Sequence, residues 1–213
     1  MPYAELAATL SSGLLVTVQV TAGAALLAVV MAVIAGLARS SRNPLVRWPA
    51  ATYVEIFRGT SALVQLFWIY FVLPRFGIDI GAIAAAVAAL GLNAGAYGAE
   101  VVRGAIRAVP QGQRDAAVAL NLSPARTLFR VIWPQAVPAM LPPAGNLAIE
   151  LLKNSALVSL IAVSELTFTA QLLRTSTLQT TEIFTLVLLA YFALALCITA
   201  GMRRVERRWK IAA

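Results

Sequence analysis

The chain has 213 residues, of which 60% are hydrophobic and 12% are charged, and its mean hydropathy is +0.81. A soluble domain of this size would carry about 25% charged residues, so the composition indicates a multi-spanning membrane protein. The absence of histidine excludes His-based catalysis and His-ligated metal sites, and the single cysteine, Cys197, excludes an intrachain disulfide.

Five segments are long and apolar enough to cross a membrane, which requires about 20 mostly apolar residues. We expect spans at about 14–38, 49–73, 80–102, 138–163 and 183–202. The fourth is the least regular, because it contains three prolines and two charged residues. Between the last two spans, 164–182 is partly amphipathic and predicts a short helix along the outer surface. The predicted fold class is therefore an all-α membrane protein forming one domain over 1–213.

The basic residues indicate the orientation of these spans. With the N-terminus outside, 14 of the 17 Lys and Arg residues fall in cytoplasmic segments, namely 39–58, 103–130 and 203–210. Only Arg75 and Arg174 fall outside, and Lys153 lies within a span. Cytoplasmic loops carry an excess of Lys and Arg, so the sequence predicts an N-out/C-in topology. The formal charge of +8 is then a topology signal rather than a nucleic-acid footprint.

The cytoplasmic segment 110–134 reads as two short helices joined by a tight bend. In the first helix, helical spacing places four residues on one face: Gln113, Ala116, Ala117 and Leu120. Asn121 follows, at the position after a helix where the backbone turns left-handed, a conformation that Gly takes most easily and Asn second. We therefore expect the bend at Asn121.

The second helix of this segment is expected to begin at Ser123 and Pro124, an N-cap followed by a residue with helix-compatible φ. Its apolar face would comprise Ala125, Leu128, Phe129 and Ile132, opposite Arg126 and Arg130. Pro134 has no N–H and disfavours helical backbone at Trp133, so we expect the helix to end there. On local physics alone, 110–134 is an amphipathic hairpin that would lie on the membrane surface.

Ionisable residues near the span ends occur as spaced pairs. Glu55 and Arg58 are three residues apart, as are Glu100 and Arg103. Such i, i+3 neighbours share a helical face and form local ion pairs that contribute about 0.2–0.5 kcal/mol. We interpret both pairs as structural.

A second polar group lies within the fourth predicted span. Glu150 and Lys153 are followed directly by Asn154 and Ser155. Ionisable residues inside a membrane are costly and normally face a cavity or one another. Two interpretations are open: the group lines a polar translocation pathway, or Glu150 and Lys153 form a structural pair at the seam of a dimer.

The order of residues in 115–134 resembles the EAA loop of ABC-transporter permeases. That motif has an acidic residue, two alanines, a glycine four residues later, and then Ile-x-Pro. Here Asp115 stands for the usual Glu, Asn121 for the Gly and Trp133 for a common Leu, while Pro134 matches. Asp keeps the charge and Asn keeps access to the left-handed turn, so the departures are mild.

Three further segments resemble permeases of the polar amino acid group. Residues 55–60 match the E-x-F-R-G-T pattern, with Ser61 in place of the following Pro, and Gln65 lies in the adjoining match. Residues 96–113, which include Tyr97, match A-Y-x-x-E-x-x-R-G and its continuation. Residues 151–157 match L-L-K-x-(S/T)-(S/A)-L. Together the matches cover about half of the chain, in the expected order.

The resemblance implies a permease subunit of a polar amino acid ABC importer, of the histidine/glutamine/arginine/glutamate type, in the bacterial cytoplasmic membrane. In that family 110–134 is the coupling loop that docks on the ATP-binding subunit. The implied coupling residues are Asp115, Ala116, Ala117, Asn121, Ser123 and Pro134. The candidate pathway residues are Gln65, Tyr97, Glu150, Lys153, Asn154 and Ser155.

The same resemblance implies the partners. We expect two ATP-binding subunits, a second permease subunit that is either a copy of this chain or a different one, and an extracytoplasmic solute-binding protein. ATP hydrolysis would occur in the partner, so no catalytic residue, cofactor or metal is expected in this chain. Compatible solutes such as ectoine are alternative substrates to a polar amino acid.

Three other functions are weighed against this one. An ATP-independent channel or pore-forming subunit would need no ATPase partner. A membrane-embedded enzyme would need a nucleophile, base or metal constellation, and none is visible in the sequence. An exporter permease would lack the EAA-like loop, which is associated with importers.

Overall fold

The computed structural model describes residues 3–210, in which every regular element is a helix and no strand is formed. The predicted domain 1–213 therefore extends at both ends beyond the described residues. The elements in order are α1 (Tyr3–Arg39), α2 (Pro44–Gly59), α3 (Ala62–Phe67), η1 (Trp68–Val72), η2 (Leu73–Phe76), α4 (Ala82–Ala108), α5 (Gln111–Ala119), α6 (Pro124–Arg126), η3 (Thr127–Ile132), α7 (Trp133–Asn154), η4 (Ser155–Ile161), α8 (Leu166–Thr177) and α9 (Thr180–Lys210).

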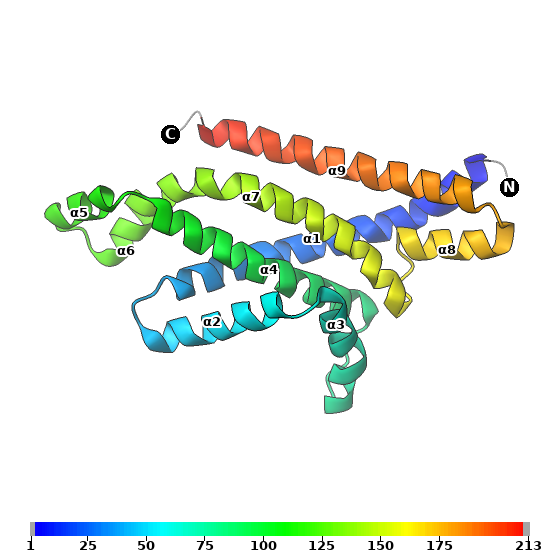
Figure 1. The fold of residues 1–213 in the computed structure, drawn as a ribbon, viewed down its shortest axis with the longest axis horizontal. Coiled ribbons are helices and arrows are strands. Elements are labelled where there is room, and N and C mark those ends of the chain that lie inside the picture. Colours follow the sequence, from blue (N-terminus) through cyan, green and yellow to red (C-terminus); the bar gives the residue numbers. More distant parts are fainter. Residues whose placement is uncertain (1–2, 211–213) are drawn as a thin grey trace.

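Three helices are individually long and apolar enough to cross a membrane: α1, α4 and α9. Two further pairs of helical segments qualify when each bent pair counts as one span, which gives up to five spans among residues 3–210. Figure 1 shows α5 and α6 at one end of the elongated molecule and α8 at the other, beside the start of α1. The all-helical membrane fold is thus confirmed, and 164–182 contains the predicted short helix, α8.

The expectation of one continuous second span at 49–73 is wrong. Helix α2 ends at Gly59, and the chain bends by 107° before continuing as 62–76. The bend leaves carbonyls at the end of α2 without partners in the helix, and the side chain of Gln65 donates hydrogen bonds to two of them. Its side-chain nitrogen donates to the carbonyls of Phe57 at 2.9 Å and Thr60 at 3.3 Å. The buried Asn93 on α4 donates to the Phe57 carbonyl as well.

Helices α1 and α4 pack at backbone contact through glycines. A Cβ atom added at Gly98 would lie 2.7 Å from the Cβ of Ala32, and one at Gly36 would lie 2.7 Å from the Cβ of Val102. Small residues permit such close approach between membrane helices, where packing rather than a hydrophobic driving force holds helices together. The α1–α4 pair therefore forms the centre of the fold, against which α2 and α7 pack.

The prediction that the second helix of 110–134 ends before Pro134 is also wrong. Trp133 is helical, with φ −57° and ψ −49°, and its N–H donates to the carbonyl of Leu128, five residues back. The segment η3 is a π-helix, whose wider turn accommodates the missing proline donor. In addition, the side chain of Gln135 donates to the carbonyl of Val131 at 2.7 Å. The segment 110–134 thus continues directly into α7.

Candidate functional site

The bend in 110–134 has the predicted left-handed backbone at Asn121, with φ +52°. The N–H of Leu122 donates to the carbonyl of Ala117 at 3.0 Å, and the N–H of Asn121 donates to that of Val118 at 2.9 Å. These two bonds form a Schellman motif, which satisfies carbonyls at the end of α5. The prediction for Asn121 is confirmed, and the bend is a defined turn.

Exposed side chains make up most of this segment. Ala117 is buried, whereas Val118 is 70% exposed and Leu120 is 74% exposed. The predicted common face of α5 is therefore divided, because Ala116 and Leu120 face outward. Exposed apolar residues flanking a rigid turn are typical of a surface that a partner covers. We call the exposed residues Val118, Leu120 and Asn121 the apolar tip.

The predicted polar residues of the segment are also exposed. Asp115 accepts a hydrogen bond from the side chain of Gln111 at 3.0 Å. Ser123 precedes α6 with extended backbone, as an N-cap residue does, but its side chain makes no capping hydrogen bond. Pro134 is exposed near the start of α7. These side chains are available for contacts outside the chain.

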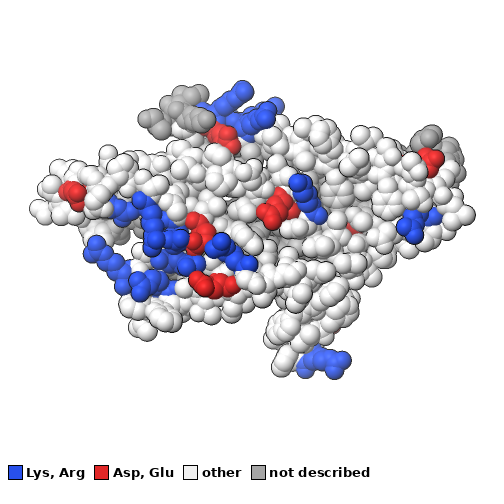
Figure 2. Space-filling model, in the orientation of Figure 1, with Lys and Arg blue, Asp and Glu red and all other residues white. Residues whose placement is uncertain are grey.

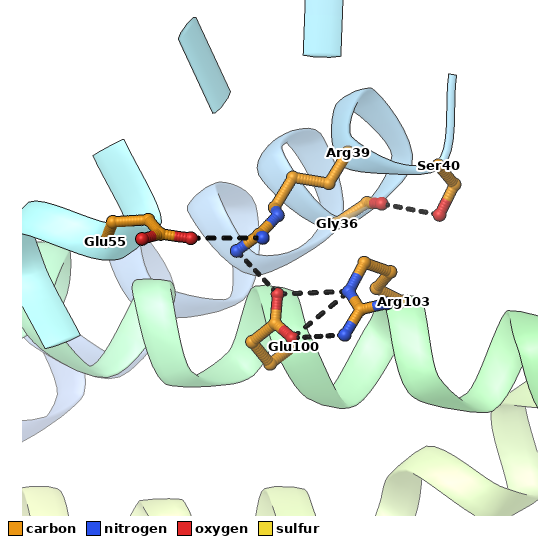
Figure 3. A network of polar contacts seen from close by, with 6 residues as sticks. All are labelled: Gly36, Arg39, Ser40, Glu55, Glu100 and Arg103. Atoms are coloured by element: carbon orange, nitrogen blue, oxygen red, sulfur yellow. Dashed lines mark hydrogen bonds and ion pairs between the residues drawn. The ribbon is translucent and has the colours of Figure 1, made fainter. Parts of the chain in front are cut away.

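Near the same end, four side chains from three helices form what we call the ion-pair network: Arg39, Glu55, Glu100 and Arg103 (Figure 3). Glu100 lies at its centre. It forms an ion pair with Arg39 of α1 at 2.7 Å and accepts hydrogen bonds from both Nε and Nη2 of Arg103 on its own helix. The predicted Glu100–Arg103 pair is present. Arg39, which the sequence reasoning missed, adds a contact between helices.

The predicted partner of Glu55 differs from the observed one. Glu55 lies 3.6 Å from Arg39. Arg58 instead places its guanidinium 5.3 Å from the ring centre of Tyr97, a cation–π contact. The sequence spacing identified a possible neighbour along α2, but it could not show that the end of α1 lies beside that helix.

The candidate pathway residues are divided between two places. Glu150 and Lys153 are both exposed on α7, and Asn154 is partly exposed. A small pocket between α4 and α7 is lined by Tyr97, Glu150 and Asn154, among others. Ser155, in contrast, is buried and donates a hydrogen bond to the carbonyl of Leu152. The side chain of Gln65 donates to the Phe57 carbonyl at the bend within 49–73. The structure thus brings only part of the predicted set together.

The exposed residues of α7 form a continuous stripe, which we call the α7 polar face. Its members recur every three or four positions and are Gln135, Ala139, Pro142, Asn146, Glu150 and Lys153. Two of these are charged on a helix that belongs to one of the bent pairs long and apolar enough to cross a membrane. Charges at such positions require water, a partner or one another.

One fully buried carboxylate was missed by the sequence reasoning. Glu165 caps α8, where it accepts from the N–H of Phe168 at 2.7 Å and from the hydroxyl of Tyr191 at 3.1 Å. Thr17 of α1 also lies within hydrogen-bond distance, at 3.4 Å. Burial raises the pKa of the Glu165 carboxyl above its usual value, and the hydrogen bonds to its oxygens oppose that shift. The signal available was its place just before an amphipathic run, which favours a cap.

Comparison with known proteins gives consistent results. Residues 26–211 match the family described as binding-protein-dependent transport system inner membrane component. A probable amino-acid ABC transporter permease of Sinorhizobium fredii is 45% identical, over 99% of this chain and 92% of its own length. The L-cystine transport system permease TcyB of Bacillus subtilis is 40% identical, over 76% of this chain and 69% of its own.

A solved structure is also similar. The crystal structure of an amino acid ABC transporter with histidines has a chain that is 36% identical and superimposes with a TM-score of 0.88, covering 96% of both chains. The similarity therefore extends over almost the whole fold, including the bent pairs and the 110–134 segment.

Proposed function

The chain belongs to the binding-protein-dependent transport system inner membrane components, and from this premise we propose how its residues link transport to ATP hydrolysis. It is the permease component of an amino-acid ABC importer in the cytoplasmic membrane, and it is not itself an enzyme. Permeases of this family act with ATP-binding subunits and solute-binding proteins. The topology, the coupling residues and the pathway are our proposals.

We propose five spans over a single domain, with the N-terminus outside and 110–134 in the cytoplasm. The five proposed spans lie in α1, in the bent segment that starts with α2, in α4, in α7 with η4 after residue 134, and in α9, while α8 lies along the outer surface. The basic residues support this orientation, because Arg114 and Arg126 lie in the segment, Arg107 lies just before it, and cytoplasmic loops of membrane proteins carry an excess of Lys and Arg.

The single observation that carries the coupling proposal is the apolar tip held on a hydrogen-bonded turn. Val118 and Leu120 are exposed at the end of α5, and Asn121 directly after them takes the left-handed backbone between α5 and α6. We propose that the tip docks on an ATP-binding subunit, with Asp115, Ala116 and Ser123 at the rim. Ala117 and Pro134 are assigned to the conformation of the segment. Ala117 is buried next to the tip, and Pro134 follows the π-helix that joins the segment to α7.

The test measures ATP hydrolysis and amino acid uptake together in reconstituted complexes. Asn121→Arg places a large charged side chain at the tip in a strained backbone conformation, and Asp115→Ala removes the rim charge. Both should reduce the uptake obtained per ATP hydrolysed. Asn121→Gly is the matched control, because Gly takes the same backbone without strain. Unchanged coupling in Asn121→Arg would refute the proposal, as would equal loss in the control.

For the pathway, we propose that the α7 polar face borders a water-filled route between two permease subunits. One span set of this size cannot enclose a polar path, and Glu150 and Lys153 are exposed where lipid would be costly. Asn154 and Tyr97 lie beside them at the small pocket between α4 and α7. Ser155 and Gln65 have local backbone partners, so we assign them to holding the helices that border the route.

For the transported solute, we propose a chemical class and not a single compound. The relatives are associated with L-cystine in one case and with histidines in another. We propose a polar amino acid, with a compatible solute such as ectoine as the alternative. Direct binding of candidate solutes to the cognate solute-binding protein, followed by uptake of the tightest ligand, distinguishes them. Uptake that continues without any ATP-binding subunit would instead support the channel alternative.

A further inference from the structure

The end of the molecule where α1 meets α2 and α4 holds more positive charge than its acids neutralise. Figure 2 shows Lys and Arg side chains gathered over this region. The two carboxylates of the ion-pair network are already shared with Arg39 and Arg103. Three more arginines here are exposed and have no ion-pair partner among residues 3–210: Arg42, Arg47 and Arg107.

These arginines line two adjoining pockets. One of about 460 Å³ lies between the turn after α1 and the end of α4, and one of about 550 Å³ lies along α2. Arg39, Arg47 and Arg107 line both, so the two pockets lie next to each other. We call the two pockets together the basic trough. Its arginines are Arg39, Arg42, Arg47, Arg103, Arg107 and Arg114, of which Arg103 lines only the pocket along α2.

The trough has the chemistry of a phosphate site. Arginine presents a planar fork of N–H donors that matches phosphate oxygens, and several converging guanidinium groups favour an anion with more than one oxygen. Arg114 is held in place by a bond of 2.8 Å to the carbonyl of Ile106. The exposed Arg47 and Arg107 have no such partner, and their charge is available to an occupant.

The rim of the trough indicates where the phosphate comes from. Leu45 is 84% exposed and Trp48 is 68% exposed, both on the first two turns of α2, and Trp48 lines the trough itself. Exposed Trp beside Arg is typical of the membrane–water boundary, and basic pockets between membrane helices bind lipid headgroups. We propose that the basic trough binds the headgroup phosphate of an anionic phospholipid, whose acyl chains lie along the apolar side of α2.

Lipid binding in the basic trough depends only on the membrane location of the chain. The lipid proposal can therefore fail while the coupling proposal holds, and the coupling proposal can fail while the lipid proposal holds. The experiment uses the detergent-purified complex of the permease with its ATP-binding subunits. Brominated phosphatidylglycerol, whose acyl-chain bromine quenches nearby tryptophan, is titrated into it. The Trp48 signal is the difference between this protein and its Trp48→Phe variant. Brominated phosphatidylcholine supplies the same chains and phosphate without net charge.

Arg47→Gln combined with Arg107→Gln should weaken phosphatidylglycerol binding by roughly tenfold to thirtyfold, since each basic residue near an anionic lipid contributes about a factor of five. Both side chains are exposed and lie outside the ion-pair network, so folding should be retained. The matched control, Arg203→Gln with Arg204→Gln, removes equal charge from α9 and should change binding less than twofold.

Four outcomes would overturn the inference. Equal losses in the two double variants would reduce it to general charge attraction. Equal binding of phosphatidylcholine would remove the need for an anionic lipid. Full displacement of the lipid by millimolar inorganic phosphate would assign the trough to a free anion. Loss of the ATP-binding subunit from the Arg47/Arg107 variant during purification, with lipid affinity kept, would assign the trough to that protein.

Discussion

Glu100 shows how one side chain can join two membrane helices. It forms an ion pair with Arg39 on α1 and accepts hydrogen bonds from Arg103 on α4, and only 19% of its side chain is exposed. Glu55 contacts the same Arg39 from α2, but at 3.6 Å and with 72% of its side chain exposed. The two carboxylates therefore share Arg39 as a partner, but Glu100 lies closer to it, is more buried and also binds Arg103.

We expect Glu100→Gln to lower the free energy of unfolding by about 1–3 kcal/mol, because it leaves Arg103 without its charged acceptor and Arg39 with only the more distant Glu55. Glu55→Gln should cost less than about 1 kcal/mol, as is usual for exposed ion pairs. Thermal unfolding of the detergent-solubilised protein measures both. Equal shifts in the melting temperature would contradict the central place that the structure gives to Glu100.

Glu165 should make stability depend on pH. Because burial raises its pKa in the folded protein, the folded state binds a proton more tightly than the unfolded state does. Its contribution is thus fully present below the usual pKa of Glu and is lost as pH rises through the raised value. Glu165→Gln keeps an acceptor for the Phe168 N–H and should flatten this decline. The check is the melting temperature of both proteins from about pH 4.5 to pH 8; parallel curves would contradict it.

At the scale of elements, the α1–α4 contact depends on particular glycines. Gly98→Ala should destabilise the protein, since the new methyl would meet the Cβ of Ala32, which cannot move without the backbone. We expect a loss of about 1–3 kcal/mol. Gly104→Ala on the same helix is the control: nothing lies within 4 Å of its added Cβ, and removing a helical glycine should stabilise by about 0.5–1 kcal/mol. Opposite signs in the two melting-temperature shifts are the expected result.

Elements of the fold were predictable where the signal is local. The apolar segment 14–38 is helical, as part of the longer α1, and Asn121 has the left-handed backbone that its turn preference predicts. The break at 60–61 was not predictable, because its freed carbonyls are satisfied by Gln65 and by Asn93 from a distant helix. The prediction that the helix ends before Pro134 was wrong for a related reason. The wider turn of the π-helix η3 accommodates the missing N–H of the proline, and no local sequence rule predicts a π-helix here.

Site residues divide in the same way. The segment 110–134 was found because its order of residues is a motif, and its exposed tip is where that motif predicted contacts. Arg39 and Glu165 were missed, since their partners lie on other helices and the sequence carries no record of that proximity. Spacing along a helix identifies neighbours on one face only, which is why Arg58 was paired with Glu55 instead of Tyr97.

At the scale of the whole molecule, the question is whether the α7 polar face borders a water-filled route between two permease subunits. A cysteine there reacts with a membrane-impermeant maleimide only if water reaches it, because the reactive species is the thiolate. In a Cys197→Ser background, we expect Asn146→Cys to react, and the rate to change severalfold when the complex is trapped with ATP. Leu188→Cys on α9 is the control, since this leucine is 69% exposed on an apolar helix and should meet lipid. If Asn146→Cys were as inert as Leu188→Cys in every state, the α7 polar face would be a dry seam, and its charged residues would serve the assembly of two subunits instead of the passage of solute.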